Sequence, residues 1–390
     1  MISREELRKL AGFEARKPNE VAVSFYFRAS TPQDRSHRGE AILAKDVVRQ
    51  TMQELQADGA HRAAMNDLER ILRLAENLHG NQSRTKAVFA CGGRNIWQEF
   101  DVPSSSASTR LFVNRRFHLK PLAPVFSDFP RLWIGLIDRQ RARILELQFD
   151  ELREHAQLAS SLPRHRSDGF GGYDGGHAQR HEEDEVRRHY RSVAEFLKNG
   201  AEKKLFEALV VGCHDVNWPE FHAQLHPYVL KRLLGRFSSD LGALTDTEAK
   251  QGAEHVLRES LERHHQNLIE EALNGAESNG LGVTGLRRVL RATELGEVET
   301  LLMTSDYMAR AVECTACGHL DSHLVRFCTL CGRATRRLED VSEALVPMAI
   351  KNNIALVLVP RAQNLDRVGN IAAVLRFRAD RNMNQLRRAS

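Results

Sequence analysis

The chain has 390 residues, of which 42% are hydrophobic, and a formal net charge of +5. This length indicates two or three domains, and the apolar content excludes a disordered chain. The charged N-terminus lacks the apolar run of a signal peptide and the longest apolar runs are strand-sized, so we expect a soluble, cytoplasmic protein that spans no membrane.

The first predicted domain covers residues 1–127 and mixes strands with helices. VAVSFYF (21–27) is a candidate for a buried strand, and helix periodicity follows from about Glu40 to Asp58. A second helical stretch begins at His61 and ends at Gly80, because glycine commonly terminates a helix. KAVFACGG and RLFVNRRF then predict two further strands.

The second predicted domain covers residues 128–272. LWIGLIDRQRARILELQ (132–148) has the pattern of a hairpin with a polar turn. A glycine-rich loop at 164–182 follows and leads into a helix whose first turns are acidic, as a helix N-terminus favours. EALVVG predicts a strand, and a charged helix closes the domain near residue 272.

The third predicted domain covers residues 273–390 and alternates helices with strands. LRRVLRATELG and VSEALVPMAIKN read as helices, whereas EVETLLMT and IALVLVP read as strands. We therefore expect an αβα sandwich with a cysteine-rich segment inserted into it.

Four cysteines form the most specific motif. Cys314, Cys317, Cys328 and Cys331 make a C-x2-C pair, ten intervening residues and a second C-x2-C pair. Two such knuckles supply the sulfur tetrahedron that Zn²⁺ prefers, so the spacing predicts a structural zinc ribbon at 314–331. Two disulfides or a redox pair are the alternatives. Cys91 and Cys213 lie in strand-like contexts and read as reduced core residues.

The glycine-rich loop holds five glycines within eight residues, in DGFGGYDGGHAQR (168–180). Glycine permits close backbone approach and positive φ angles, and aromatic side chains within such a loop can stack on unpaired bases. A disordered linker without a fixed partner is the alternative interpretation. The candidate loop residues are Gly169, Phe170, Gly171, Gly172, Tyr173, Gly175, Gly176 and His177.

Basic residues gather in four clusters, around Arg110–Lys120, Arg139–Arg143, the glycine-rich loop and the C-terminal tail from Leu375. Solvated surface explains any single cluster, whereas four of them favour an RNA or ribosome partner. The candidate RNA-binding residues are Arg164, His165, Arg166 and Arg180 beside the loop, and Arg35, Arg38 and Lys45 in the first domain, where an exposed helix start is an equal alternative.

Two histidines offer a weaker metal hypothesis. His177 and His181 are spaced i, i+4 and share a helix face, as metal ligands can. No third ligand is evident in the sequence nearby, so solvated or RNA-facing side chains are the preferred interpretation.

Several segments resemble the archaeo-eukaryotic class-1 release factor and Pelota family. In the third domain these are SNGLGVTGLRRVLRATELGEVETLLMTSD and IALVLVPRAQNLDRVGNIAAVLRF, with a cysteine-rich insertion found in some archaeal members. In the middle domain they are RLWIGLIDRQRARILEL, the glycine-rich loop and RHYRSVAEFL, preceded by FHLKPLAPVFSD. The resemblance implies a three-domain α/β architecture of the release-factor and Pelota type.

Two motifs of the family are missing. Release factors carry Gly-Gly-Gln before the middle helix, whereas this chain has Gly171-Gly172-Tyr173 or, shifted by four residues, Gly175-Gly176-His177. The region that corresponds to the stop-codon motif Asn-Ile-Lys-Ser reads HRGEAILAKDVVRQ. Among bacterial relatives this pattern is most similar to the Balon group of Pelota-like ribosome hibernation factors.

That resemblance implies a monomeric, ribosome-associated protein that occupies the A site and contacts 16S and 23S rRNA. The first domain would lie in the decoding centre, the loop would reach the peptidyl-transferase centre, and the later domains would meet elongation factor Tu. Such a protein blocks translation during stress and is not an enzyme. A rescue factor that hydrolyses peptidyl-tRNA is the alternative, and an RNA-binding protein acting away from ribosomes is a third possibility.

Overall fold

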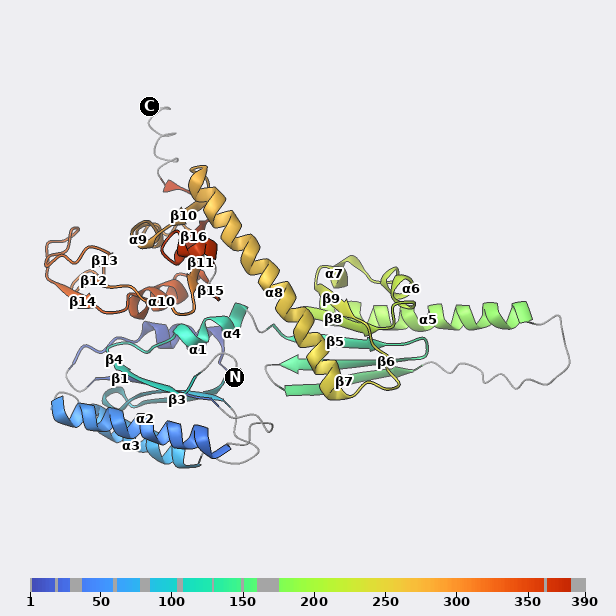
Figure 1. The fold of residues 1–390 in the computed structure, drawn as a ribbon, viewed down its shortest axis with the longest axis horizontal. Coiled ribbons are helices and arrows are strands. Elements are labelled where there is room, and N and C mark those ends of the chain that lie inside the picture. The colour runs from blue at the N-terminus through green and yellow to red at the C-terminus, as the bar shows by residue number, and fades with distance from the viewer. Residues whose placement is uncertain are drawn as a thin grey trace. The chain divides into compact units, whose positions relative to one another are not determined.

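The computed structural model describes residues 2–17, 20–28, 37–58, 62–77, 85–103, 108–127, 130–148, 151–159, 175–360 and 363–379. They form two compact units. One unit combines residues 1–127 with 265–390, and the other comprises 128–264. The first therefore holds the N-terminal and C-terminal sheets together (Figure 1).

The N-terminal sheet has four strands in the order β3-β2-β1-β4 and is antiparallel throughout its described pairs. Every residue of β1 is buried, as its apolar sequence predicts, and α2 and α3 bury their apolar stripes against this sheet. The elements are α1 (Arg4–Gly12), β1 (Ala22–Phe27), α2 (His37–Asp58), α3 (Arg62–Asn77), β2 (Lys86–Cys91), η1 (Gly92–Arg94), β3 (Ile96–Asp101), β4 (Arg110–Asn114), η3 (Lys120–Leu122) and α4 (Pro124–Ser127).

The helix α1 and the strand β3 are among the elements of this part that were not predicted. The helix α1 begins with a capping box in which Ser3 and Glu6 satisfy each other's backbone N–H groups, a signal that is legible in the sequence. The strand β3 carries no such pattern, because its side chains are mostly half-buried. The predicted helix end at Gly80 lies outside the described residues.

The second unit is built on a five-stranded mixed sheet in the order β7-β6-β5-β8-β9. The helix α5 covers one face and the first half of α8 covers the other, which gives two separate apolar layers. The elements are β5 (Leu132–Ile137), β6 (Arg141–Gln148), β7 (Glu151–Ala159), α5 (Gly175–Glu202), β8 (Ala208–Cys213), α6 (Trp218–His222), α7 (Pro227–Leu230), β9 (Leu233–Phe237) and α8 (Asp246–Glu277).

The β5–β6 hairpin and β8 lie where the sequence predicts them, and β5 pairs with β8 in parallel. The strand β7 was not predicted, because this edge strand carries no clear alternation of apolar side chains. Close packing fixes α5 on the sheet: a Cβ atom added at Gly200 would lie 2.6 Å from the Trp133 ring. A side chain larger than hydrogen therefore has no room there.

The C-terminal sheet has the order β10-β16-β11-β15, and β11 pairs with β15 in parallel. Ile269 and Ala272 of α8 pack on it, so the end of this helix already belongs to the C-terminal core, although the predicted boundary at residue 272 stays a prediction. The elements are β10 (Gly282–Thr284), α9 (Leu286–Glu294), β11 (Val298–Thr304), α10 (Ser342–Lys351), β15 (Ala355–Val359), α11 (Gln363–Asp366) and β16 (Ile371–Leu375).

The cysteine-rich insertion between β11 and α10 forms a separate three-stranded sheet of its own, in the order β13-β12-β14. Its strands are β12 (Ala311–Cys314), β13 (Leu320–Asp321) and β14 (Thr335–Leu338). The mixed α/β fold class is confirmed, and the insertion lies within the C-terminal αβα part as predicted. Within the described residues, no helix combines the length and apolar character needed to cross a bilayer.

Candidate metal centre and RNA-facing residues

The four motif cysteines converge at the base of the insertion. Their Sγ atoms all lie within 4.8 Å of one another, with 3.4 Å between Cys314 and Cys331 and 3.7 Å between Cys317 and Cys328. Sulfurs about 2.3 Å from a central Zn²⁺ form a tetrahedron with edges of about 3.8 Å, which this spacing approaches. In this structure all six cysteines are free thiols, and none of them forms a disulfide.

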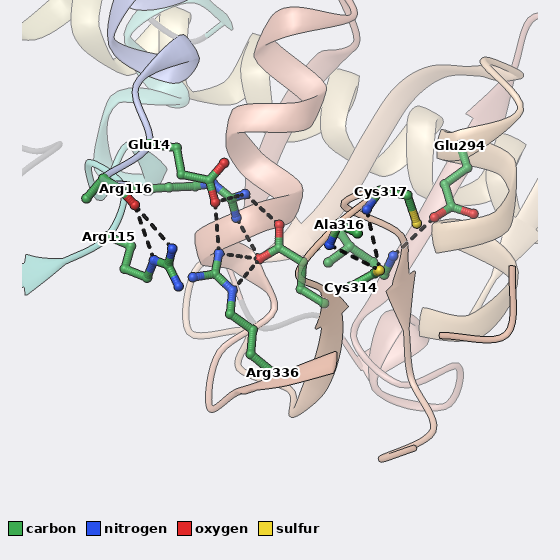
Figure 2. A network of polar contacts seen from close by, with 11 residues as sticks. Glu14, Arg115, Arg116, Glu294, Cys314, Ala316, Cys317 and Arg336 are labelled. Carbon is green, nitrogen blue, oxygen red and sulfur yellow. Dashed lines mark hydrogen bonds and ion pairs between the residues drawn. The ribbon is translucent and has the colours of Figure 1, made fainter. Parts of the chain in front are cut away.

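The two turns that carry the cysteines have the geometry of metal-binding knuckles. Gly318 and Gly332 adopt φ values of +75° and +70°, which glycine reaches without strain. The backbone N–H groups of Cys317 and Ala316 donate to the Cys314 Sγ at 3.4 Å and lower the pKa of that thiol to about 6 (Figure 2). These bonds favour the thiolate of Cys314, and the close spacing of the four sulfurs is compatible with a zinc ribbon.

Beside the cysteines lies a four-residue ion network of Glu14, Arg116, Glu313 and Arg336 (Figure 2). Arg116 donates through both terminal nitrogens to the Glu313 carboxylate, at 2.5 and 2.9 Å. Arg336 donates to the same carboxylate from the opposite strand, at 2.6 and 3.0 Å. Glu14 accepts from both arginines, so the two positive and two negative charges alternate.

Glu313 is the most buried member, with 4% of its side chain exposed. Burial alone would raise the pKa of this carboxyl group, but the hydrogen bonds and charges of Arg116 and Arg336 bring it below its ordinary value. Removing one partner from such a buried network leaves an uncompensated charge, which typically costs about 3–5 kcal/mol.

Several members of the first basic cluster are committed to contacts within the protein. Arg116 belongs to the ion network, Arg115 donates to the Ala15 carbonyl, and the buried Lys120 donates to the Tyr307 carbonyl at 2.6 Å. Sequence reasoning missed this because the acceptors lie far along the chain.

The second cluster is also partly neutralised within its own unit. Arg143 pairs with Glu154 at 2.8 Å and with Asp246 at 3.0 Å. Arg139 lies 3.5 Å from Glu182 of α5, and both side chains are about half exposed. These positive charges are consequently less available to a polyanion than the sequence implies.

The candidate loop lies mostly outside the described residues, which include no part of 160–174. Gly169 to Tyr173 and the flanking Arg164, His165 and Arg166 thus stay predictions. The structure places Gly175, Gly176 and His177 in the first turn of α5, where the first four backbone N–H groups have no partner within the helix. The side chains of His177 and His181 also lie outside the description.

The remaining RNA candidates differ in their placement. Arg180 is exposed on α5, and its side chain forms no hydrogen bond or ion pair with the described residues. Lys45 lies half-buried on α2. Arg38 belongs to the same helix, but its side chain lies outside the described residues, and so does the whole of Arg35. Arg180 belongs to one compact unit and Lys45 to the other.

Comparison with known proteins connects the middle of the chain to one family. Residues 118–277 match the model of bacterial archaeo-eukaryotic release factor family 10. This chain is 24% identical over 311 residues to peptide chain release factor subunit 1 of Archaeoglobus fulgidus, covering 74% of this chain and 75% of the relative. It is also 24% identical over 412 aligned positions to the Pyrococcus abyssi protein of that name, with 96% of each chain covered.

One solved structure is also similar to this chain in part. A model of ribosome-bound archaeal Pelota and ABCE1 aligns over 96% of this chain and 94% of the other, with 14% identity and a TM-score of 0.41. The family match and the curated relatives confirm the predicted resemblance at the level of the family.

Proposed function

We propose, from the chain's confirmed resemblance to the archaeo-eukaryotic class-1 release factors and Pelota, that it is a ribosome-binding translation factor. More specifically, we propose a ribosome hibernation factor that works in the cytoplasm. As a monomer it would occupy the ribosomal A site, contact 16S and 23S rRNA, and block decoding and peptidyl transfer during stress without catalysis.

The absence of Gly-Gly-Gln from a release-factor-like middle domain carries this proposal. Hydrolysis of peptidyl-tRNA needs a donor aimed at the developing oxyanion and room for an attacking water. A backbone N–H after two glycines can supply the donor, but the phenol of Tyr173 is larger than an amide and would exclude the water. We therefore favour occlusion of the catalytic centre over catalysis.

The glycines of the loop suit this role because a cavity built around the ends of two tRNAs admits backbone better than side chains. Phe170 and Tyr173 can each add about 1–3 kcal/mol by stacking on an unpaired base. Arg164, His165, Arg166 and the exposed Arg180 would neutralise phosphates at the loop base. Among first-domain residues we retain Arg35, Arg38 and Lys45 as candidate contacts in the decoding centre.

For the cysteine cluster we propose a structural Zn²⁺ held by Cys314, Cys317, Cys328 and Cys331. Four thiolates close the coordination shell and leave no position for a reacting water, so the ion would support the fold and take no part in chemistry. The ribbon and the C-terminal sheet would offer the surface for elongation factor Tu.

Two assays test the proposal and its main alternative. The protein is expected to co-sediment with ribosomes from stationary or cold-stressed cells, whereas an RNA-binding protein acting elsewhere would stay in the supernatant. Added to ribosomes that carry labelled peptidyl-tRNA, it is expected to inhibit translation and leave the peptide attached. Release of the peptide would establish the rescue-factor alternative and overturn occlusion.

A variant isolates the loop. Replacing both Gly171 and Gly172 with Val adds branched side chains and is expected to lower translation inhibition at least tenfold. Gly12→Val is a suitable control, because a Cβ atom at Gly12 meets nothing within 4 Å. Unchanged ribosome affinity and inhibition in the double variant would show that the loop does not enter the catalytic centre.

A further inference from the structure

The ion network joins the cysteine-rich insertion to the N-terminal sheet. Glu313 directly precedes Cys314 in β12 and lies opposite Arg336 in β14. Their partners come from the N-terminal part of the same compact unit: Arg116 follows β4, and Glu14 follows α1. Figure 2 shows Glu14, Arg116 and Arg336 of the network near the turn that carries Cys314 and Cys317.

The insertion has too small a core to hold these charges in place by itself. Its buried apolar side chains are few, and Leu324, Phe327 and Leu330 are 49%, 67% and 72% exposed. Small domains with so little buried apolar surface usually need a metal or a disulfide to fold, and the cysteines here are free. A metal at the four cysteines would therefore set the positions of β12 and β14.

Backbone contacts transmit that constraint to the network. The Thr315 N–H donates to the Ala334 carbonyl at 3.1 Å, and the Cys328 N–H donates to the Arg333 carbonyl at 2.7 Å. These bonds connect both knuckles to the segment that leads into β14, where Arg336 lies. On the other side, the Ala15 N–H donates to the Arg115 carbonyl at 2.8 Å, which holds the two N-terminal partners of the network together.

We propose that the metal-loaded insertion is a clamp that fastens the N-terminal sheet to the C-terminal part of the protein. The metal holds Glu313 and Arg336 where they engage Arg116 and Glu14. Loss of the metal releases this ionic attachment, while the packing of α1 on α10, the Lys120–Tyr307 hydrogen bond and the core of each sheet stay in place. This inference rests on the proposed metal and is independent of the proposed ribosome role.

Hydrogen exchange on the full-length protein tests the clamp. Zinc content is measured first, before and after treatment with a zinc chelator; absence of zinc from the untreated protein would overturn the metal and the clamp together. Removal of the metal is expected to speed amide exchange at least tenfold in residues 13–17 and 115–119. Exchange in β2, which lies in the N-terminal core, is expected to stay unchanged.

Glu313→Gln separates the clamp from simple unfolding of the insertion. With zinc still bound, this variant is expected to show the same fast exchange at 13–17 and 115–119. If Glu313→Gln loses zinc, amide exchange is measured in Arg116→Gln instead, which removes the partner of Glu313 in the N-terminal part. The matched control is Glu339→Gln, whose pair with Arg310 is 72–76% exposed.

Two outcomes would overturn the clamp. In the first, the metal-free protein or the zinc-loaded variant retains slow exchange at residues 13–17. In the second, β2 loses protection together with these residues, which would make the metal a global stabiliser and not a local fastening.

Discussion

Arg116 and Glu313 form a bidentate pair although 197 residues separate them along the chain. Glu313 is buried and Arg116 is 14% exposed, and both are paired with further charges of the network, Arg336 and Glu14, so their charges are balanced within the protein. Arg116, which the sequence places in a basic cluster, thus contributes to contacts that stabilise the fold.

Glu313→Ala is expected to lower the free energy of unfolding by about 3 kcal/mol, because two arginines lose their shared acceptor in a buried setting. Chemical denaturation of the transition that includes the C-terminal part measures the loss. Glu339→Ala removes an exposed pair and is expected to cost less than about 1 kcal/mol. An equal decrease in the free energy of unfolding in the two variants would contradict the burial of the Glu313 network.

Stability is expected to fall as the pH drops from 7 to 5, partly through His118. Burial lowers the pKa of this imidazole to about 4, from an ordinary value near 6.5. The unfolded chain therefore binds the proton first, and stability present above pH 6.5 is lost as the pH falls toward 4. At pH 5 the loss from this residue amounts to at most about 2 kcal/mol.

His118→Phe provides the comparison for that pH dependence. The ring of His118 stacks on Phe112 with centroids 3.8 Å apart, and phenylalanine keeps a ring in this place. Urea midpoints of both proteins at pH 7 and pH 5 are expected to show a smaller decrease in the variant. Equal decreases would place the titrating group elsewhere.

Cys328→Ser is expected to abolish stoichiometric zinc binding, because one of the four thiolate ligands is lost. Elemental analysis of the purified protein measures the metal. Cys213→Ser is the control: Cys213 is buried in the core of the second unit, and the variant is expected to retain its zinc. Retention of zinc by Cys328→Ser would contradict the proposed ligand set.

Arg180→Glu is expected to weaken ribosome binding. It is also expected to lower the slope of log affinity against log salt concentration by about one, the contribution of one phosphate contact. Filter binding across a salt series measures the slope. Arg188→Glu, on the same helix, is the comparison, since Arg188 already pairs with Glu185 at 2.7 Å. Equal slopes for the wild type and Arg180→Glu would remove Arg180 from the proposed contact set.

Gly200→Ala is expected to destabilise the second unit by about 1–3 kcal/mol, because the added methyl group would overlap the Trp133 ring, 2.6 Å from its nearest atom. Thermal unfolding followed by tryptophan fluorescence measures the shift. Gly12→Ala has open space around its Cβ position and is expected to be neutral or slightly stabilising. A neutral Gly200→Ala variant would show that the ring can move aside.

The sequence alone determined the features that depend on local pattern. Strands such as β1 and β8 follow from continuous apolar runs, α9 from its periodicity, and the cysteine ribbon from its spacing. The family resemblance could also be recognised from segments of the sequence that follow one another in the family's order.

Only the tertiary structure decided which charged residues are free. Arg116, Lys120 and Arg143 read as surface cations in the sequence, yet each has an acceptor that is distant along the chain. Charge pairing depends on which residues lie close together in space, and the local sequence pattern does not show this. For the same reason, the attachment between the cysteine ribbon and the N-terminal sheet became visible only when β12, β14 and β4 were placed together.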